Sequence, residues 1–186
     1  RKPEVQAYIQ EKMCDFLFEN GFGYLKIDYN DNYGMGCDGA ESLGEAGRQV
    51  AEESLGWLGR LREQIPDLVI ENCSSGGSRI EPLRMQKVSM CSFSDAHECG
   101  EIPLVAANVS RVIPARQNQI WAVLREQDTP ARIEWSLAAA MIGRICISGD
   151  ILHLTKEQRA ALSAGLAFYE DVKEIVAEGD IAEILC

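Results

Sequence analysis

Apolar residues recur along this chain in two alternating patterns. The first has a period of about 3.6 residues, which predicts amphipathic helices. It begins at Pro3, a residue that favours a helix start, and stops at Asn20-Gly21, which favours a helix end. Ser42 and Thr155 each open a capping-box sequence, so two more helices should begin there. The expected helices cover residues 3–20, 43–65, 102–112, 130–142 and 156–175.

The second pattern is a short apolar run, which predicts a buried strand. Strands that alternate with helices form right-handed βαβ units and a parallel sheet. Two architectures fit: a five-stranded doubly wound sheet, or part of a (β/α)8 barrel, whose complete form needs about 250 residues. One helix precedes the first strand, which favours a segment that begins partway through a barrel. The expected strands cover residues 24–28, 68–71, 87–93, 119–124 and 144–148.

Composition narrows the class of protein. The 186 residues are 46% hydrophobic and 25% charged, which is enough for one domain with a core. Eighteen basic against 29 acidic residues give a net charge of −11, which repels phosphate backbones and argues against a nucleic-acid partner. No apolar run approaches the roughly 20 residues that span a bilayer, so no membrane partner is expected. The chain starts at Arg1 without a signal-peptide pattern, and we expect residues 1–186 to be a fragment of a longer chain.

The seven cysteines indicate a reducing environment. Their number is odd and no C-x-x-C pair occurs, which argues against a disulfide framework and a four-ligand zinc site. We therefore expect a cytoplasmic location. Most of these thiols should be small core residues, and only Cys73 is a candidate site residue.

Carboxylates follow four of the five predicted strands: Asp28, Glu71, Asp95 and Asp150. In parallel α/β folds, ligands bind at the carboxyl ends of the strands, where such side chains converge. A single acid there is more often a helix cap, but several together favour a site.

Two chemistries suit such a group of acids. One is divalent-metal binding, and the other is glycoside hydrolysis, which needs two carboxyl groups about 5–5.5 Å apart for retention of configuration. Further metal ligands are scarce, because His97 and His153 are the only histidines. Loss of activity with a chelator would favour the metal alternative.

Three segments, in order, resemble motifs of glycoside hydrolase family 36, the retaining α-galactosidases. Residues 26–30, K-I-D-Y-N, resemble the family's K-W-D-x-N motif. Residues 71–79 are similar to its E-x-C-x-S-G-G-G-R stretch, and residues 94–98 to its S-D-x-x-D motif. Segments 119–124 and 148–151 resemble its closing strands, so the resemblance covers nearly the whole chain.

This resemblance implies an α/β fold, namely the C-terminal portion, about five βα units, of a (β/α)8 TIM barrel. Residues 1–186 would be a partial catalytic domain of a longer chain. The implied activity is hydrolysis of terminal α-D-galactosyl residues from oligosaccharides, without metal or cofactor, by a parent protein that forms a homo-oligomer. The alternatives are an α-N-acetylgalactosaminidase, a galactosyltransferase, or an inactive fragment that lacks the N-terminal half of the site.

The resemblance also assigns roles to residues. Asp28 matches the nucleophile and Asp95 the general acid/base. The other matches lie in the same three motifs and are implied to bind the sugar or to orient groups that do. They are Lys26, Asn30, Cys73, Gly76, Arg79 and Glu98.

Three departures leave the sugar and linkage preference open. Ile27 stands where the family has Trp, and we expect this to remove a large ring beneath the nucleophile. Ser78 replaces a glycine, and Glu98 replaces Asp, which moves a contact by one methylene.

The proposed roles agree with elementary electrostatics. Lys26 lies two positions before Asp28, so both side chains face the same way in a strand. A nearby cation favours the carboxylate form, although Lys26 could equally pair with a core acid. Asp95 must begin protonated, and its neighbours Phe93 and Ala96 provide a less polar setting that would raise its pKa. It would then serve as a base toward water.

Overall fold

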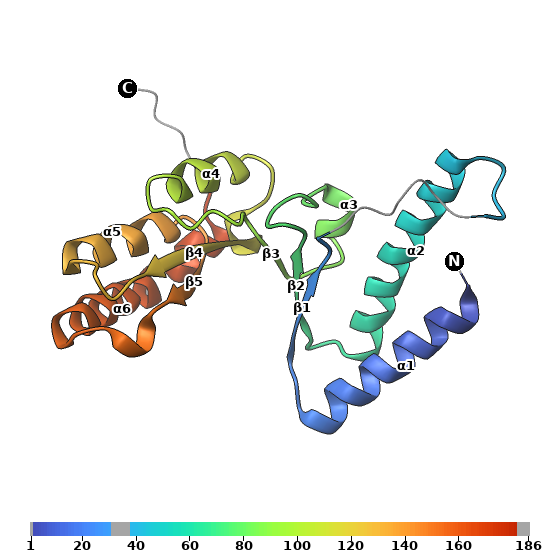
Figure 1. Ribbon diagram of the computed structural model, residues 1–186, viewed down its shortest axis with the longest axis horizontal. Helices are drawn as coiled ribbons and strands as arrows, with labels where there is room; N and C mark the ends of the chain where they lie inside the picture. The colour runs from blue at the N-terminus through green and yellow to red at the C-terminus, as the bar shows by residue number, and fades with distance from the viewer. Residues whose placement is uncertain (1, 31–37, 182–186) are drawn as a thin grey trace.

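The five strands form one parallel sheet. The computed structural model describes residues 2–30 and 38–181. Each strand lies beside the next one along the chain (Figure 1). A doubly wound sheet would reverse its strand order at a switch point, whereas sequential order is that of a barrel, so the barrel prediction is confirmed. The strands are β1 (Tyr24–Asp28), β2 (Val69–Cys73), β3 (Met90–Ser92), β4 (Asn118–Leu124) and β5 (Arg144–Gly149).

Five of the described helices are those predicted from the apolar period, but the one that begins at Ile102 ends at Val109 instead of residue 112. Thr155 and Gln158 form the expected capping box with both reciprocal hydrogen bonds, and the Ser42 side chain accepts from the backbone nitrogen of Glu45 at 3.1 Å. The helix at Pro82 was not predicted, because one turn is too short to show a period. The helices are α1 (Pro3–Asn20), α2 (Leu43–Gln64), α3 (Pro82–Met85), α4 (Ile102–Val109), α5 (Pro130–Ala140) and α6 (Lys156–Glu178), with short 3-10 turns η1 (Ala115–Gln117) and η2 (Ile151–His153).

The helices pack on the sheet in two groups, each with its own apolar core. α1 and α2 lie at the β1–β2 end, and α5 and α6 lie at the β4–β5 end (Figure 1). Leu17, Leu61 and Ile70 belong to the first core, and Ile120 and Leu137 belong to the second. Both cores lie on the helix side of the sheet, which leaves the other face of the strands for polar residues.

The strand boundaries differ from the prediction by one residue at β4 and β5 and by more at β2 and β3. β3 is limited to Met90–Ser92, since residues 87–89 are not in the strand. β2 continues through Asn72 and Cys73, so Glu71 lies in the middle of the strand instead of at its end. The expectation that Glu71 is a strand-end acid is therefore wrong, because the strand is longer than its apolar run.

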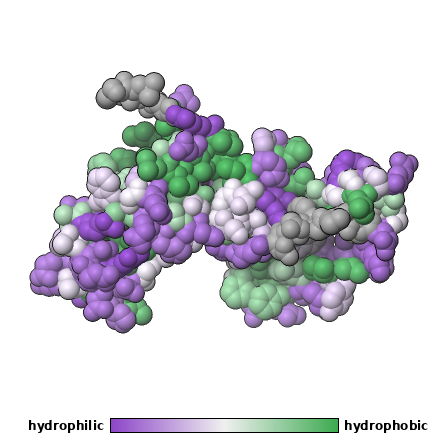
Figure 2. All heavy atoms as spheres, turned by 45° about the horizontal axis from the view of Figure 1, so that its top comes forward, coloured by the Kyte–Doolittle hydropathy of each residue, from purple (hydrophilic) through white to green (hydrophobic). Residues whose placement is uncertain are grey.

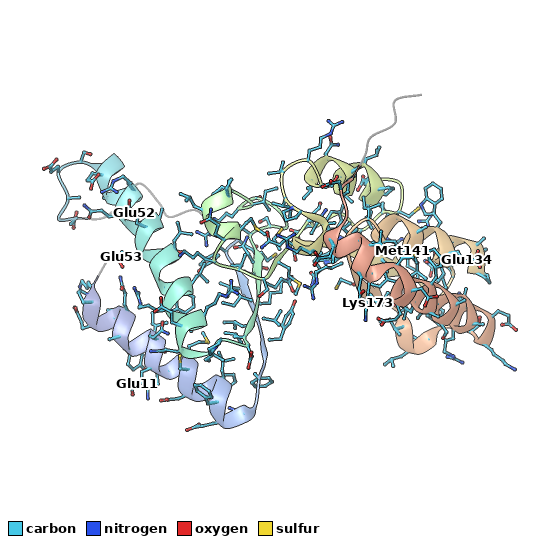
Figure 3. The ribbon with its side chains drawn as sticks, turned by 180° about the vertical axis from the view of Figure 1, so that it is seen from behind. Glu11, Glu52, Glu53, Glu134, Met141 and Lys173 are labelled. Atoms are coloured by element: carbon cyan, nitrogen blue, oxygen red, sulfur yellow. The ribbon has the colours of Figure 1, made fainter. Side chains whose placement is uncertain are left out.

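The charged residues lie largely on the outside. Glu11 on α1 and Glu52 and Glu53 on α2 are exposed (Figure 3). Hydrophilic residues cover much of the face drawn in Figure 2, with apolar patches between them. None of the described helices combines the length and apolar character needed to cross a bilayer.

Candidate active site

The carboxyl ends of β1 and β2 are joined by their backbones. Asp28, the last residue of β1, pairs in register with Cys73, the last residue of β2. The backbone nitrogen of Tyr29 donates to the Cys73 carbonyl oxygen at 3.0 Å, and the Ser74 hydroxyl donates to the Tyr29 carbonyl oxygen. The side chain of Asp28 is exposed, and these hydrogen bonds hold the backbone next to it in place.

Asn30 holds the loop that follows β2. Its Oδ1 atom accepts from the backbone nitrogen of Ser75 at 2.9 Å. Ser75 has a positive φ of 44°, a conformation that few non-glycine residues adopt, and this hydrogen bond helps to hold it. Since Oδ1 is used by the loop, contact with a ligand would fall to the Nδ2 group of Asn30.

Gly76 and Gly77 let the β2 loop press against the segment that carries Asp95. A Cβ atom on Gly76 would lie 2.4 Å from the carbonyl carbon of Ser94 and 2.5 Å from the backbone nitrogen of Asp95. A Cβ atom on Gly77 would lie 2.4 Å from the carbonyl oxygen of Phe93. Gly76 also has a φ of +70°, which glycine adopts without strain. The second motif therefore packs against the third, and contact of Gly76 with a sugar stays a prediction.

Lys26 pairs with a buried acid. Its Nζ atom lies 3.2 Å from Oε1 of Glu71, whose side chain is 5% exposed against 40% for Lys26. Burial acts to lower the pKa of Lys26, but the hydrogen bond and charge of Glu71 outweigh it and raise that pKa, with smaller contributions from Cys73 and Asp28. The pairing with a core acid, which the sequence left as an alternative, is the arrangement observed.

Cys73 is buried at the end of β2, 2% exposed, and its thiol is free. Burial raises the pKa of this thiol above its ordinary value, against the lowering effect of hydrogen bonds from the Gly76 backbone and the Ser92 side chain. The thiol is therefore neutral near pH 7.

Arg79 stacks on the residue that follows Asp28. Its guanidinium carbon lies 4.8 Å from the centroid of the Tyr29 ring, a cation–π distance. Its carbonyl oxygen accepts from Nδ2 of Asn72 at 2.8 Å. Arg79 thus supports the backbone beyond the candidate nucleophile.

Glu98 pairs with Arg125, whose Nη2 atom lies 2.6 Å from its Oε1 atom. The hydrogen bond and charge of Arg125 lower the pKa of the Glu98 carboxyl. Both side chains are well exposed, so the pair contributes little to stability. Any contact of Glu98 with a ligand would have to compete with this arginine.

The expectation that Ile27 removes a large ring from beneath the nucleophile is wrong. Successive residues of a strand face opposite sides, so Ile27 points away from Lys26 and Asp28 and packs against the core formed with α1 and α2. It lines a cleft of about 540 Å³ together with Trp57 of α2. The replacement of Trp by Ile therefore changes packing behind the strand, and no ring is lost from beneath the nucleophile.

Trp121 of β4 was not predicted as a site residue. Its ring centroid lies 5.8 Å from Nζ of Lys26 and 5.2 Å from the ring centroid of His97. Alternation along β4 could have shown that Trp121 faces the site, because Ile120, Ala122 and Leu124 are fully buried against the helices and position 121 must face the other side.

Within the described part of the chain, no three His, Cys, Asp or Glu side chains are grouped so as to hold a metal ion.

Known proteins share both sequence and fold with this chain. The sequence profile of the Melibiase family matches residues 1–179. Alpha-galactosidase AgaA of Geobacillus stearothermophilus is 26% identical over 201 residues, which cover 100% of this chain and 27% of AgaA. Probable alpha-galactosidase G of Emericella nidulans is 27% identical over 190 residues, or 96% of this chain and 24% of that protein. The chain thus spans about a quarter of the length of these curated relatives.

The same relationship appears in three dimensions. The crystal structure of a variant of GH36 α-galactosidase AgaA in complex with raffinose matches 99% of this chain and 26% of its own, with a TM-score of 0.87 and 21% identity. The α-galactosidase of Lactobacillus brevis matches 96% of this chain and 25% of its own, with a TM-score of 0.85 and 20% identity. Identity this low establishes the fold alone. From the profile that matches nearly its full length, we conclude that the chain belongs to the melibiase family, the α-galactosidases of glycoside hydrolase family 36.

Proposed function

We propose that the protein to which this chain belongs is a retaining α-galactosidase, with Asp28 as nucleophile and Asp95 as general acid/base. Its substrates would be oligosaccharides with a terminal α-D-galactosyl residue. Family membership supports the activity. Two of the matched structures are complexes of AgaA variants with raffinose and stachyose, which supports this class of substrate.

The observation that carries the assignment of the two acids is the β2 loop between them. On one side it is bonded to Tyr29 and Asn30, which follow Asp28. On the other side Gly76 is in van der Waals contact with the backbone at Asp95. The two carboxylates therefore extend from segments that one loop holds together, which supports a site that both acids share.

In this mechanism the Asp28 carboxylate attacks the anomeric carbon while Asp95 gives its proton to the glycosidic oxygen. The bond to the leaving group breaks, and a β-linked galactosyl ester on Asp28 forms. Asp95, now ionised, takes a proton from water, which attacks the same carbon and releases Asp28. Two inversions return the sugar to the α configuration. Lys26, Asn30 and Cys73 would contact its hydroxyl groups.

The stereochemistry of the product tests this proposal. The full-length protein is mixed with an α-galactoside, and the anomeric protons are followed by NMR before mutarotation. We expect α-galactose to appear first. If β-galactose appears first, Asp28 is not a nucleophile, and the two acids act instead by single displacement. A panel with α-N-acetylgalactosaminides and sugar acceptors measures the competing specificities.

The location and the assembly of the protein are two further properties. We propose a reducing, cytoplasmic location, which is supported by the free state of all five cysteines in the described ranges. We also propose that the full-length protein is a homo-oligomer, on family resemblance alone. Alkylation of thiols in freshly lysed cells and light scattering of the purified protein test the two statements.

A further inference from the structure

Glu71 is a buried carboxylate at the centre of the sheet that the proposed mechanism does not use. It is 3% exposed. Ser92 of β3 donates to its Oε1 atom at 2.5 Å, and Gln119 of β4 donates to its Oε2 atom at 3.3 Å. The Tyr24 hydroxyl of β1 donates to Oε2 as well. With Lys26 at 3.2 Å, four side chains from three neighbouring strands converge on it.

These partners keep Glu71 charged. Burial by itself would raise the pKa of this carboxyl, but the hydrogen bonds from Ser92, Tyr24 and Lys26 outweigh it and lower the pKa. A buried charge needs both a counter-ion and hydrogen bonds to be tolerated. Lys26 is the only cation among the four partners, so the negative charge of Glu71 acts on Lys26.

The Lys26 side chain is held at two points. Glu71 lies at 3.2 Å, and the ring of Trp121 lies 5.8 Å away, within the range of a cation–π contact. A free lysine side chain loses rotamer entropy when it is fixed. Here much of that cost is met before a ligand arrives. The ammonium remains partly exposed and lies on the same face as Asp28, two residues further along β1.

We propose that Glu71 is a positioning residue, which holds the Lys26 ammonium beside Asp28 so that it meets a hydroxyl group of the bound galactosyl residue. This inference rests on the proposed function and names the residue that prepares one part of its sugar site. Glu71 itself does not contact the sugar. Its effect passes through Lys26.

The first test is kinetic and uses the full-length protein. Glu71→Gln keeps the shape of the side chain and removes its charge. A hydrogen bond to a charged group contributes about 1.5–3 kcal/mol, so we expect kcat/KM for an α-galactoside to fall by about tenfold or more, chiefly through KM. Glu170→Gln is the matched control, because Glu170 pairs with Lys173 on the surface of α6. Its kcat/KM should equal that of the wild type.

A double variant separates positioning from a role of Glu71 on its own. Lys26→Gln removes the ammonium, and Lys26→Gln with Glu71→Gln removes both charges, which avoids an unpaired buried charge and favours folding. If Glu71 acts through Lys26, both proteins have the same kcat/KM. A further loss of about tenfold in the double variant would overturn the proposal.

The second test needs no substrate. Lys26 should react slowly with acetic anhydride at pH 8, as followed by peptide mass spectrometry, because Glu71 stabilises its protonated form. Glu71→Gln should speed acetylation of Lys26, and Glu170→Gln should speed that of Lys173 alone. Unchanged reactivity of Lys26 would show that Glu71 does not hold it. A wild-type protein that hydrolyses no α-galactoside counts against the proposed function, while the acetylation result still decides the pairing.

Discussion

Asp28 and Asp95 are distinguished from Glu71 and Asp150, the other two acids of the predicted group, by what surrounds their backbones. Both lie on segments that contact the β2 loop. Glu71 is buried in a hydrogen-bonded network, and Asp150 accepts from the backbone nitrogen of Glu126 at 3.3 Å, as a loop-stabilising residue does. These four carboxylates thus have different environments because their neighbours differ.

The two proposed catalytic acids should give different kinetic signatures in the full-length protein. Asp95→Asn removes general acid catalysis, so kcat/KM should fall by about 10²–10⁴ on galactosides with poor leaving groups and much less on aryl galactosides whose leaving group needs no proton. The value of kcat should fall on both kinds, because water loses its general base in the second step. Asp28→Asn should abolish turnover of both kinds. Asp150→Asn is the control and should retain activity. Wild-type rates in Asp28→Asn would refute the nucleophile assignment.

Glu71 should make the stability of the chain depend on acid pH. Its pKa is lowered in the folded protein, so its contribution is present above the unfolded-state pKa of about 4.3 and is lost as pH falls through the folded-state pKa. Urea unfolding from pH 7 to pH 3 measures this. We expect the free energy of unfolding of Glu71→Gln to be lower at pH 7 and to fall less steeply below pH 4. Parallel curves for the two proteins would contradict the assignment.

At the level of elements, the β2 loop is the part that orders the site. It contacts the segment after β1 through Ser75 and the segment after β3 through Gly76. The two short glycine contacts leave no room for a side chain. A loop that is fixed on both sides transmits any displacement to both acids.

Gly76→Ala should therefore impair both stability and activity. The added methyl group would meet the Ser94 backbone at 2.4 Å, and a positive φ in a non-glycine residue costs about 1–3 kcal/mol. Gly100→Ala is the matched control, because no atom lies within 4 Å of its Cβ position. Thermal unfolding and kcat/KM of the two variants give the comparison. Similar values for both would show that the loop has room to adjust.

At the level of the whole molecule, the described sheet is open, with β1 and β5 at its two edges. Tyr24, Lys26 and Asp28 of β1 are exposed on the face where the site is proposed. Catalysis in a barrel depends on a pocket that excludes water and surrounds the substrate. These five strands alone leave one side of that pocket open.

We expect the 186-residue chain by itself to show no measurable hydrolysis of α-galactosides, while the longer protein hydrolyses them. A chromogenic galactoside assay at equal molar concentrations tests this. Circular dichroism of the short chain serves as a control that it is folded. Turnover by the short chain at a rate comparable to the longer protein would show that the five strands form a sufficient site.

The sequence by itself located the longer helices, the five strands and the order of the three motifs. Apolar period, capping residues and short apolar runs are local properties, and they located α1, α2, α5 and α6 closely. The alternation of side chains along a strand is also local. It predicts that Ile27 faces the helices and that Trp121 faces the opposite side of the sheet.

Only the tertiary structure decided how these elements meet. The sequential strand order separates a barrel from a doubly wound sheet, and both have the same local pattern. The partners of Glu71 lie 21 to 48 residues away along the chain, and the contact of Gly76 with Asp95 joins two separate loops. Such contacts depend on strand register and on the path of the backbone through space, which the apolar period of a single segment does not encode.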